Sequence, residues 1–72
     1  MNYPRKEIVN MLKEDYPRGC RVELIDMNDV QAPPPGTKGT VSFVDSVGTV
    51  HVNWDNGSSL GAVYGEDSIK RI

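Results

Sequence analysis

Apolar and polar residues alternate along residues 38–63, and two short segments that end in glycine interrupt the alternation. A period of two places successive side chains on opposite faces of a strand. Residues 38–45, 49–54 and 58–63 are also rich in Val, Thr and aromatic side chains, which favour strands. The pattern therefore predicts three consecutive antiparallel strands joined by two tight hairpins.

The register of the first hairpin follows from the rule that paired residues place their side chains on the same face. A four-residue connection over residues 45–48 sets Phe43 opposite Val50 and Val41 opposite Val52. This arrangement gathers the apolar side chains of both strands on one face. We therefore expect Phe43 to belong to the inner face.

The second hairpin contains an Asn-Gly pair, which is a common two-residue turn, but that turn would leave Leu60 on the polar face. A three-residue loop over residues 55–57, with its glycine in the left-handed region, sets Val52 opposite Leu60 and Val50 opposite Ala62. The apolar pattern selects the three-residue loop.

These registers define a predicted inner face. Its members are Val22, Leu24, Val41, Phe43, Val50, Val52, Leu60 and Ala62. Trp54 is expected to seal one end of this core. Three apolar residues fall outside the face, namely Val44, Ile25 and Val63. The natural cover for them is the apolar face of an N-terminal helix, made of Ile8, Val9 and Leu12.

The N-terminal segment carries a helical pattern instead of a strand pattern. Residues 4–15 are predicted to be helical, because Ile8, Met11 and Leu12 recur at spacings of three and four residues. Pro4 suits a first helical position, where its missing N–H would have had no partner. The next proline and the next glycine, Pro17 and Gly19, are expected to end the helix.

The remaining segments complete a small sheet. A first strand is expected from about residue 21, with a bulge near Leu24 and Ile25, where the parity of the apolar residues changes. Three consecutive prolines exclude residues 28–36 from an interior strand, which makes them a long loop. Residues 64–67 fit a single 3₁₀ turn, and residues 68–72 fit a last strand.

The length of 72 residues leaves room for one hydrophobic core. Five short strands with one long loop predict a mainly β fold, a small five-stranded SH3-like barrel with one N-terminal α-helix. We expect a single SH3-like domain over residues 1–72, with the helix at 4–15 and the barrel at 21–72. A chain of this length is worth roughly 4–11 kcal/mol of folding free energy.

The charge balance argues against a protein whose main task is to grip phosphates. The formal net charge is −2, although residues 1–21 carry +2 and residues 22–72 carry −4. Cys20 is the only cysteine, so one chain forms no internal disulfide and no cysteine-based zinc site. We expect a cytoplasmic protein, because no apolar run has the length of a signal peptide or a membrane span.

His51 is the obvious candidate for acid–base chemistry, because it is the only histidine. Its parity places it on the outer face of its strand, and no motif holds a nucleophile beside it. One imidazole with Asp45 or Asp55 has no characteristic metal-ligand spacing. Residues 36–40 contain phosphate-loop residue types without the required spacing or the following helix. We therefore expect no catalytic residue, no metal and no cofactor.

The candidate binding residues are aromatic, acidic and proline side chains near the long loop and the turn before the last strand. They are Trp54, Asp55, Tyr64, Glu66, Asp67, Pro34 and Pro35. In SH3-like folds the groove between that loop and that turn is the customary ligand surface, so these residues would converge there by analogy. Trp54 also has a structural explanation, because so small a barrel has few other aromatic residues to seal it.

Several blocks of the sequence match the pattern of a known family. They are Pro-Gly-Thr-Lys-Gly-Thr-Val at 35–41, Val-Asp at 44–45, Gly-Thr-Val-His-Val at 48–52, Trp-Asp-Asn-Gly at 54–57 and Gly-Glu-Asp at 65–67. The chain resembles an uncharacterised family of short proteins from Gram-positive bacteria, phages and other mobile elements, catalogued as a domain of unknown function. The resemblance implies an SH3-like barrel and supplies no activity or partner. A remoter likeness links its hairpins to KOW modules and Mib/Herc2 domains.

Together these patterns predict a non-catalytic, monomeric protein-binding module, and not an enzyme. We expect an accessory or inhibitory factor of a phage or mobile element that acts on a host protein, because the family that the chain resembles occurs in phages and other mobile elements. The acidic body would suit a basic partner, including a defence nuclease or another protein that handles nucleic acid. The alternative is a KOW-like nucleic-acid-binding module that uses Lys38 or the cations of the N-terminal segment, Arg5, Lys6, Lys13, Arg18 and Arg21.

Overall fold

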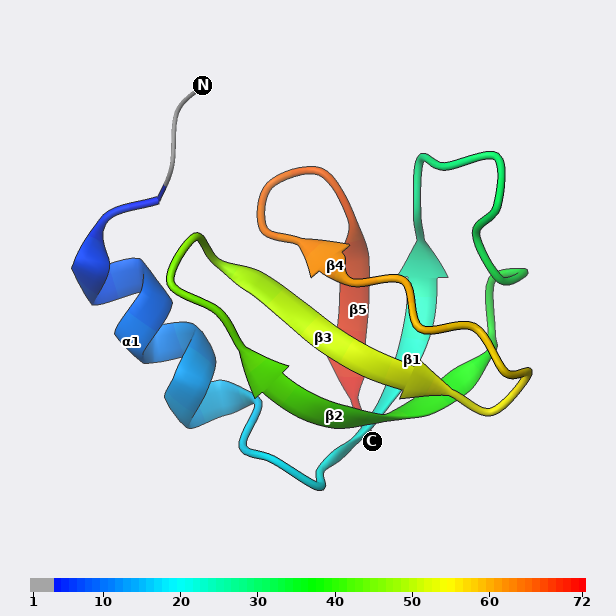
Figure 1. Ribbon diagram of the computed structural model, residues 1–72, viewed down its shortest axis with the longest axis horizontal. Coiled ribbons are helices and arrows are strands. Elements are labelled where there is room, and N and C mark those ends of the chain that lie inside the picture. Colours follow the sequence, from blue (N-terminus) through cyan, green and yellow to red (C-terminus); the bar gives the residue numbers. More distant parts are fainter. Residues whose placement is uncertain (1–3) are drawn as a thin grey trace.

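A computed structural model describes residues 4–72 as one helix and five strands. The elements are α1 (Lys6–Asp15), β1 (Arg21–Asp26), β2 (Lys38–Val44), β3 (Thr49–Trp54), β4 (Ala62–Val63) and β5 (Ser68–Arg71), as Figure 1 shows. The prediction of a mainly β fold with an N-terminal helix is confirmed. Within the described residues no helix has the length and apolar character that crossing a bilayer requires.

The five strands form one antiparallel sheet in the order β4-β3-β2-β1-β5. Figure 1 shows β1 and β5 running across the direction of β2 and β3, so the sheet is strongly bent. The arrangement is consistent with a small barrel-like fold. The predicted bulge in β1 is confirmed, because its pairing with β5 shifts register between Leu24 and Asp26. Ile25 then points outward and is exposed.

The helix begins two residues later than predicted. Arg5 is its N-cap, with extended backbone angles of φ −63° and ψ 156°, and its carbonyl accepts the N–H groups of Ile8 and Val9. Pro4 therefore lies outside the helix. It packs instead against the β2–β3 loop, where a Cβ added to Gly48 would lie 2.6 Å from the Pro4 Cγ.

The first hairpin differs from the prediction by one residue. Asp45 N donates to Thr49 O, and Gly48 N donates to Asp45 O with Gly48 at φ +85°, so the loop has three residues, 46–48. The shorter loop pairs Phe43 with His51, and a register shift between Val41 and Phe43 restores the predicted pairing of Val41 with Val52.

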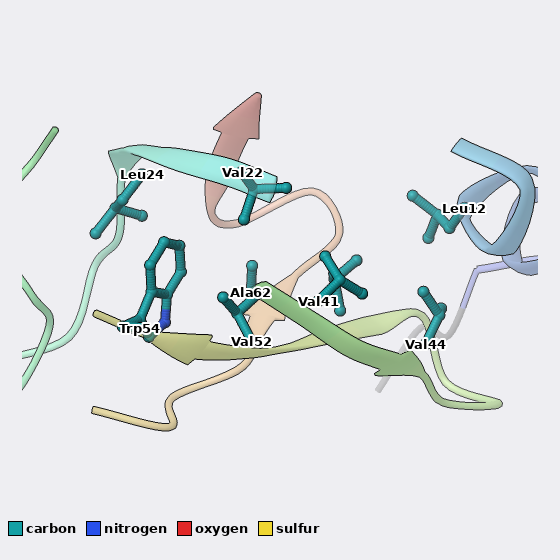
Figure 2. Close-up of a cluster of buried hydrophobic side chains, with 9 residues drawn as sticks. Leu12, Val22, Leu24, Val41, Val44, Val52, Trp54 and Ala62 are labelled. Atoms are coloured by element: carbon teal, nitrogen blue, oxygen red, sulfur yellow. The ribbon is translucent and has the colours of Figure 1, made fainter. Parts of the chain in front are cut away.

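This change of register moves two side chains to the faces of the sheet opposite to those predicted for them. Phe43 is not an inner-face residue, because it is 54% exposed and stacks on His51. Val44 was predicted to lie outside the core and is instead 8% exposed. Leu12 of α1 belongs to the same buried cluster as Val44, and Figure 2 shows the two side chains facing each other.

The three-residue loop of the second hairpin is confirmed. Gly57 N donates to Trp54 O, Trp54 N donates to Ser58 O, and Gly57 has φ +94°. The predicted strand over residues 58–63 is wrong at its start, because only Ala62–Val63 pair with β3. Leu60 is half-buried and leaves the ladder, and its carbonyl accepts the indole N–H of Trp54 at 2.8 Å.

The core agrees with most of the predicted inner face. Its buried members are Leu12, Val22, Leu24, Val41, Val44, Val50, Val52, Trp54 and Ala62. Leu24 lies close to the Trp54 ring in Figure 2, at the end of the core farthest from α1. Phe43 and Leu60 are the two predicted members that this cluster does not contain. The predicted 3₁₀ turn at residues 64–67 is an ordinary hydrogen-bonded turn.

Candidate protein-binding groove

A groove of about 440 Å³ runs between the helix and the two outer strands of the sheet. Its apolar floor includes Leu12, Val50 and Ala62, which all belong to the buried core. Tyr64 lines the groove from the β4–β5 turn and is 46% exposed, and Glu66 of the same turn is also exposed. The groove therefore combines an apolar floor with an exposed aromatic ring and a carboxylate.

The outer edge of β4 is closed by the turn that follows it. The Asp67 carboxylate accepts the Val63 N–H at 2.8 Å, and the Val63 carbonyl accepts the N–H groups of Glu66 and Asp67. The same carboxylate accepts the Asn28 N–H at 3.3 Å, which ties the long loop to this turn. Asp67 thus satisfies the backbone group that a further strand beside β4 would need.

Among the residues that the structure describes, no strand pairs with the outer edge of β5, although the Arg71 side chain donates to the Asp15 carbonyl at the end of α1 at 3.3 Å. Ile72 N donates to Arg21 O at 3.0 Å, so the alternation of an antiparallel ladder directs the backbone groups of Lys70 toward Glu23. The N–H and C=O groups of Ile69 and Arg71 then point away from β1. Ser68 and Ile69, the first two residues of β5, line the groove, so this edge of the sheet starts at the groove wall.

A comparison with known protein families shows which family the chain belongs to. A family model described as Domain of unknown function (DUF4314) matches residues 5–72. The chain belongs to the DUF4314 family. No curated protein matches the chain.

The groove of this DUF4314 chain contains three of the predicted binding residues, Tyr64, Glu66 and Asp67. Their roles differ, because Asp67 caps backbone groups while Tyr64 and Glu66 are exposed. Leu12 and Tyr16, which line the helix side of the groove, were not among the predicted binding residues. The spacing of Val9, Leu12 and Tyr16 along one helix face was the available signal. Partial burial raises the pKa of Tyr16 above its ordinary value. The negative charge of the neighbouring Asp15 raises this pKa further, by a smaller amount.

The other predicted binding residues lie elsewhere in this DUF4314 chain. Trp54 is 3% exposed, so the structural explanation of this residue is confirmed and it offers almost no surface to a ligand. Pro34 and Pro35 are exposed but do not line the groove. The groove that Tyr64 lines thus contains none of these three residues, and the hydrogen bond between the long loop and the β4–β5 turn comes from the Asn28 backbone.

Two further carboxylates are engaged within the chain. Asp55 forms a bidentate pair with Arg21, at 2.9 Å and 2.6 Å, and the hydrogen bonds from Arg21 lower the pKa of Asp55. Partial burial would raise the pKa of Asp45. The hydrogen bonds from His51 and from the N–H groups of Thr49 and Val47 outweigh that effect and lower it. Among the residues that the structure describes, the Glu66 carboxylate accepts no hydrogen bond from the chain.

His51 lies on the outer face of β3, as its parity predicts. Its Nε2 atom is 2.8 Å from Asp45 Oδ2, and the two side chains are 35% and 28% exposed. His51 lines neither this groove nor the smaller hollow beside Phe43. Within residues 4–72, no three His, Cys, Asp or Glu side chains come together in a way that would hold a metal ion.

Proposed function

We propose that this DUF4314 chain is a non-catalytic module that binds an extended segment of another protein along the groove. The open edge of β5 carries the proposal, because an exposed edge supplies main-chain hydrogen bonds to an added strand. The apolar floor beside it would take a side chain of that segment. Tyr64 would supply contact area, since aromatic residues are frequent anchors of protein interfaces.

The asymmetry of the two sheet edges supports this mode of binding. Asp67 satisfies the Val63 N–H, so a partner strand gains nothing at β4. At β5 the outward groups of Ile69 and Arg71 remain available for a partner. We therefore assign the new strand to the β5 edge of the groove, which Tyr64 and Glu66 of the preceding turn also line.

We further propose that the module serves a phage or mobile element as an accessory or inhibitory factor that acts on a host protein. This part of the proposal relies on the sequence resemblance alone. Mimicry of nucleic-acid phosphates by the acidic residues has less support, because the carboxylates of Asp45, Asp55 and Asp67 already contact groups of this chain. Glu66 is then the acidic residue best suited to meet a basic side chain of the partner.

Site-specific photo-crosslinking in the native cells tests the groove. A photoreactive amino acid at Tyr64 is expected to give one discrete protein adduct. The same amino acid at Val30, which is fully exposed in the long loop, is expected to give none. The absence of an adduct from position 64, or an equal adduct from position 30, would contradict the assignment of the groove.

A pair of substitutions at Arg71 tests the strand addition. Arg71→Pro removes the outward N–H without removing a ladder hydrogen bond, since Pro is tolerated on an edge strand. Arg71→Gln removes the same charge and keeps that N–H. We expect Arg71→Pro to weaken partner binding by about tenfold, the value of a main-chain hydrogen bond, and Arg71→Gln to leave it within about twofold. Equal effects of the two substitutions would refute strand addition while leaving the groove itself intact.

A further inference from the structure

Phe43 presents an aromatic ring on the outer face of β2. Its side chain is 54% exposed, and it stacks on His51 with ring centroids 4.2 Å apart and planes 8° from parallel. His51 lies on the neighbouring strand β3, so the stack occupies one face of the Phe43 ring. The stack leaves the opposite face of the ring uncovered by His51.

Phe43 also lines a hollow of about 280 Å³, together with residues of the segment that follows α1. Its walls include Lys13 of α1 and Arg18 of the following loop, together with Pro17 and Ser42, and no carboxylate lines it. Among the described residues, neither Lys13 nor Arg18 forms a salt bridge, whereas Arg21 is engaged by Asp55. The two cations are therefore available to an anion from outside the chain.

The aromatic platform is held in place before any ligand arrives. Asp45 contacts the His51 ring at 2.8 Å, and the same carboxylate accepts the N–H groups of Val47 and Thr49. The turn thus orients His51, and His51 orients Phe43. A ring that is already ordered loses little conformational entropy when a flat group stacks on it.

We infer that the Phe43 hollow binds single-stranded nucleic acid. An exposed base stacks on the free face of Phe43, and Lys13 and Arg18 contact the phosphates on either side of that base. An aromatic surface beside cations is the combination that sequence-tolerant single-strand binding requires. The site is independent of the groove, because no residue except Tyr16 lines both.

A single strand suits the hollow better than a duplex or a protein. The bases of a duplex are stacked on one another and do not expose a face to Phe43. A protein segment combines a flat group with negative charges only where Asp or Glu flank an aromatic residue, whereas a single strand repeats a base and a phosphate at every nucleotide. The net charge of −2 provides no long-range attraction, so the interaction depends on these local contacts.

Fluorescence anisotropy with labelled oligothymidylate of about 12 nucleotides, at about 50 mM salt, tests the inference. Phe43→Leu is expected to weaken binding by about tenfold through the loss of base stacking. The matched control is Tyr64→Leu, which removes an exposed aromatic ring from the groove and is expected to leave binding unchanged. Both variants should melt at the temperature of the parent chain, because both side chains are exposed.

The dependence of binding on salt tests the two cations independently of base stacking. Lys13→Gln with Arg18→Gln is expected to reduce the slope of log K against log salt by about 1.4, because each phosphate contact of a single strand contributes about 0.7. Lys38→Gln with Lys70→Gln removes the same charge away from the hollow and should leave the slope unchanged.

Three outcomes would overturn the inference. They are the absence of a complex at low salt, equal effects of Phe43→Leu and Tyr64→Leu, and equal changes of slope in the two charge variants. Thymidine monophosphate and a duplex of the same length complete the comparison. Either one binding as tightly as oligothymidylate would show that the hollow does not select a single strand.

Discussion

Leu24→Ala is expected to remove about 3 kcal/mol from the free energy of unfolding, within the usual range of 2–5 kcal/mol for a buried leucine. Leu24 is 1% exposed and lies beside the Trp54 ring at the end of the core (Figure 2). The substitution leaves a cavity that the short strands around it cannot refill. Because a chain of this length has only roughly 4–11 kcal/mol of stability, a large share is lost.

The neighbouring residue provides the control. Ile25 follows Leu24 in β1 and is 44% exposed, because the bulge turns it away from the core. Urea unfolding of Ile25→Ala should change the stability by about 0.5 kcal/mol or less. If Ile25→Ala destabilised the chain as much as Leu24→Ala, the placement of the bulge would be wrong.

Gly39→Ala is expected to cost about 3 kcal/mol, at the upper end of the range for overpacking a core. A Cβ on Gly39 would lie 2.6 Å from Val52 Cγ1, 2.9 Å from the Asn53 carbonyl oxygen and 2.9 Å from Trp54 Cε3. The backbone oxygen belongs to the paired strand β3 and has little room to move. The glycine is thus required by the close approach of β2 and β3.

A double substitution separates this clash from a general loss of strand propensity. Val52→Ala removes the nearest atom, so Gly39→Ala should cost less in that background than in the parent chain. Lys38→Ala, at the exposed neighbouring position, should have little effect in the same unfolding experiments. Strictly additive effects of Gly39→Ala and Val52→Ala would show that the contact is not the cause.

The two hairpins show how much of the fold follows from the sequence. Both have the same three-residue loop, with a glycine in the left-handed region as its last residue. The second loop was predicted correctly, because only that length places Val50 and Ala62 together. The first was predicted one residue too long, because the adjacent apolar pair Phe43 and Val44 fits either parity.

The error at Phe43 has a tertiary cause. The α1 helix covers this end of β2, and Leu12 joins Val44 in the buried core. The alternation of apolar and polar residues within the strand does not indicate that contact. A bulge between Val41 and Phe43 then restores the predicted register farther along the strands. Gly48 was the available signal, because it occupies the same loop position as Gly57.

The candidate site was harder to predict than the fold, because a carboxylate that caps a turn looks the same in sequence as one that meets a partner. Asp67 and Glu66 are adjacent, yet Asp67 holds the Val63 and Asn28 N–H groups while Glu66 is exposed. The open edge of β5 depends on which residues of the ladder face β1. That property becomes visible only when the strands are paired.

Amide hydrogen exchange measured by NMR tests the central claim, that β5 offers an open edge while Asp67 closes β4. We expect slow exchange at Val63 and Lys70 and fast exchange at Ile69 and Arg71, because among residues 4–72 the first two amides have hydrogen-bond partners while the last two face away from β1. In Asp67→Ala, Val63 should become fast while Lys70 remains slow. Exchange at Ile69 and Arg71 as slow as at Lys70 would contradict the claim, because it would mean that the edge proposed for the partner strand is already occupied.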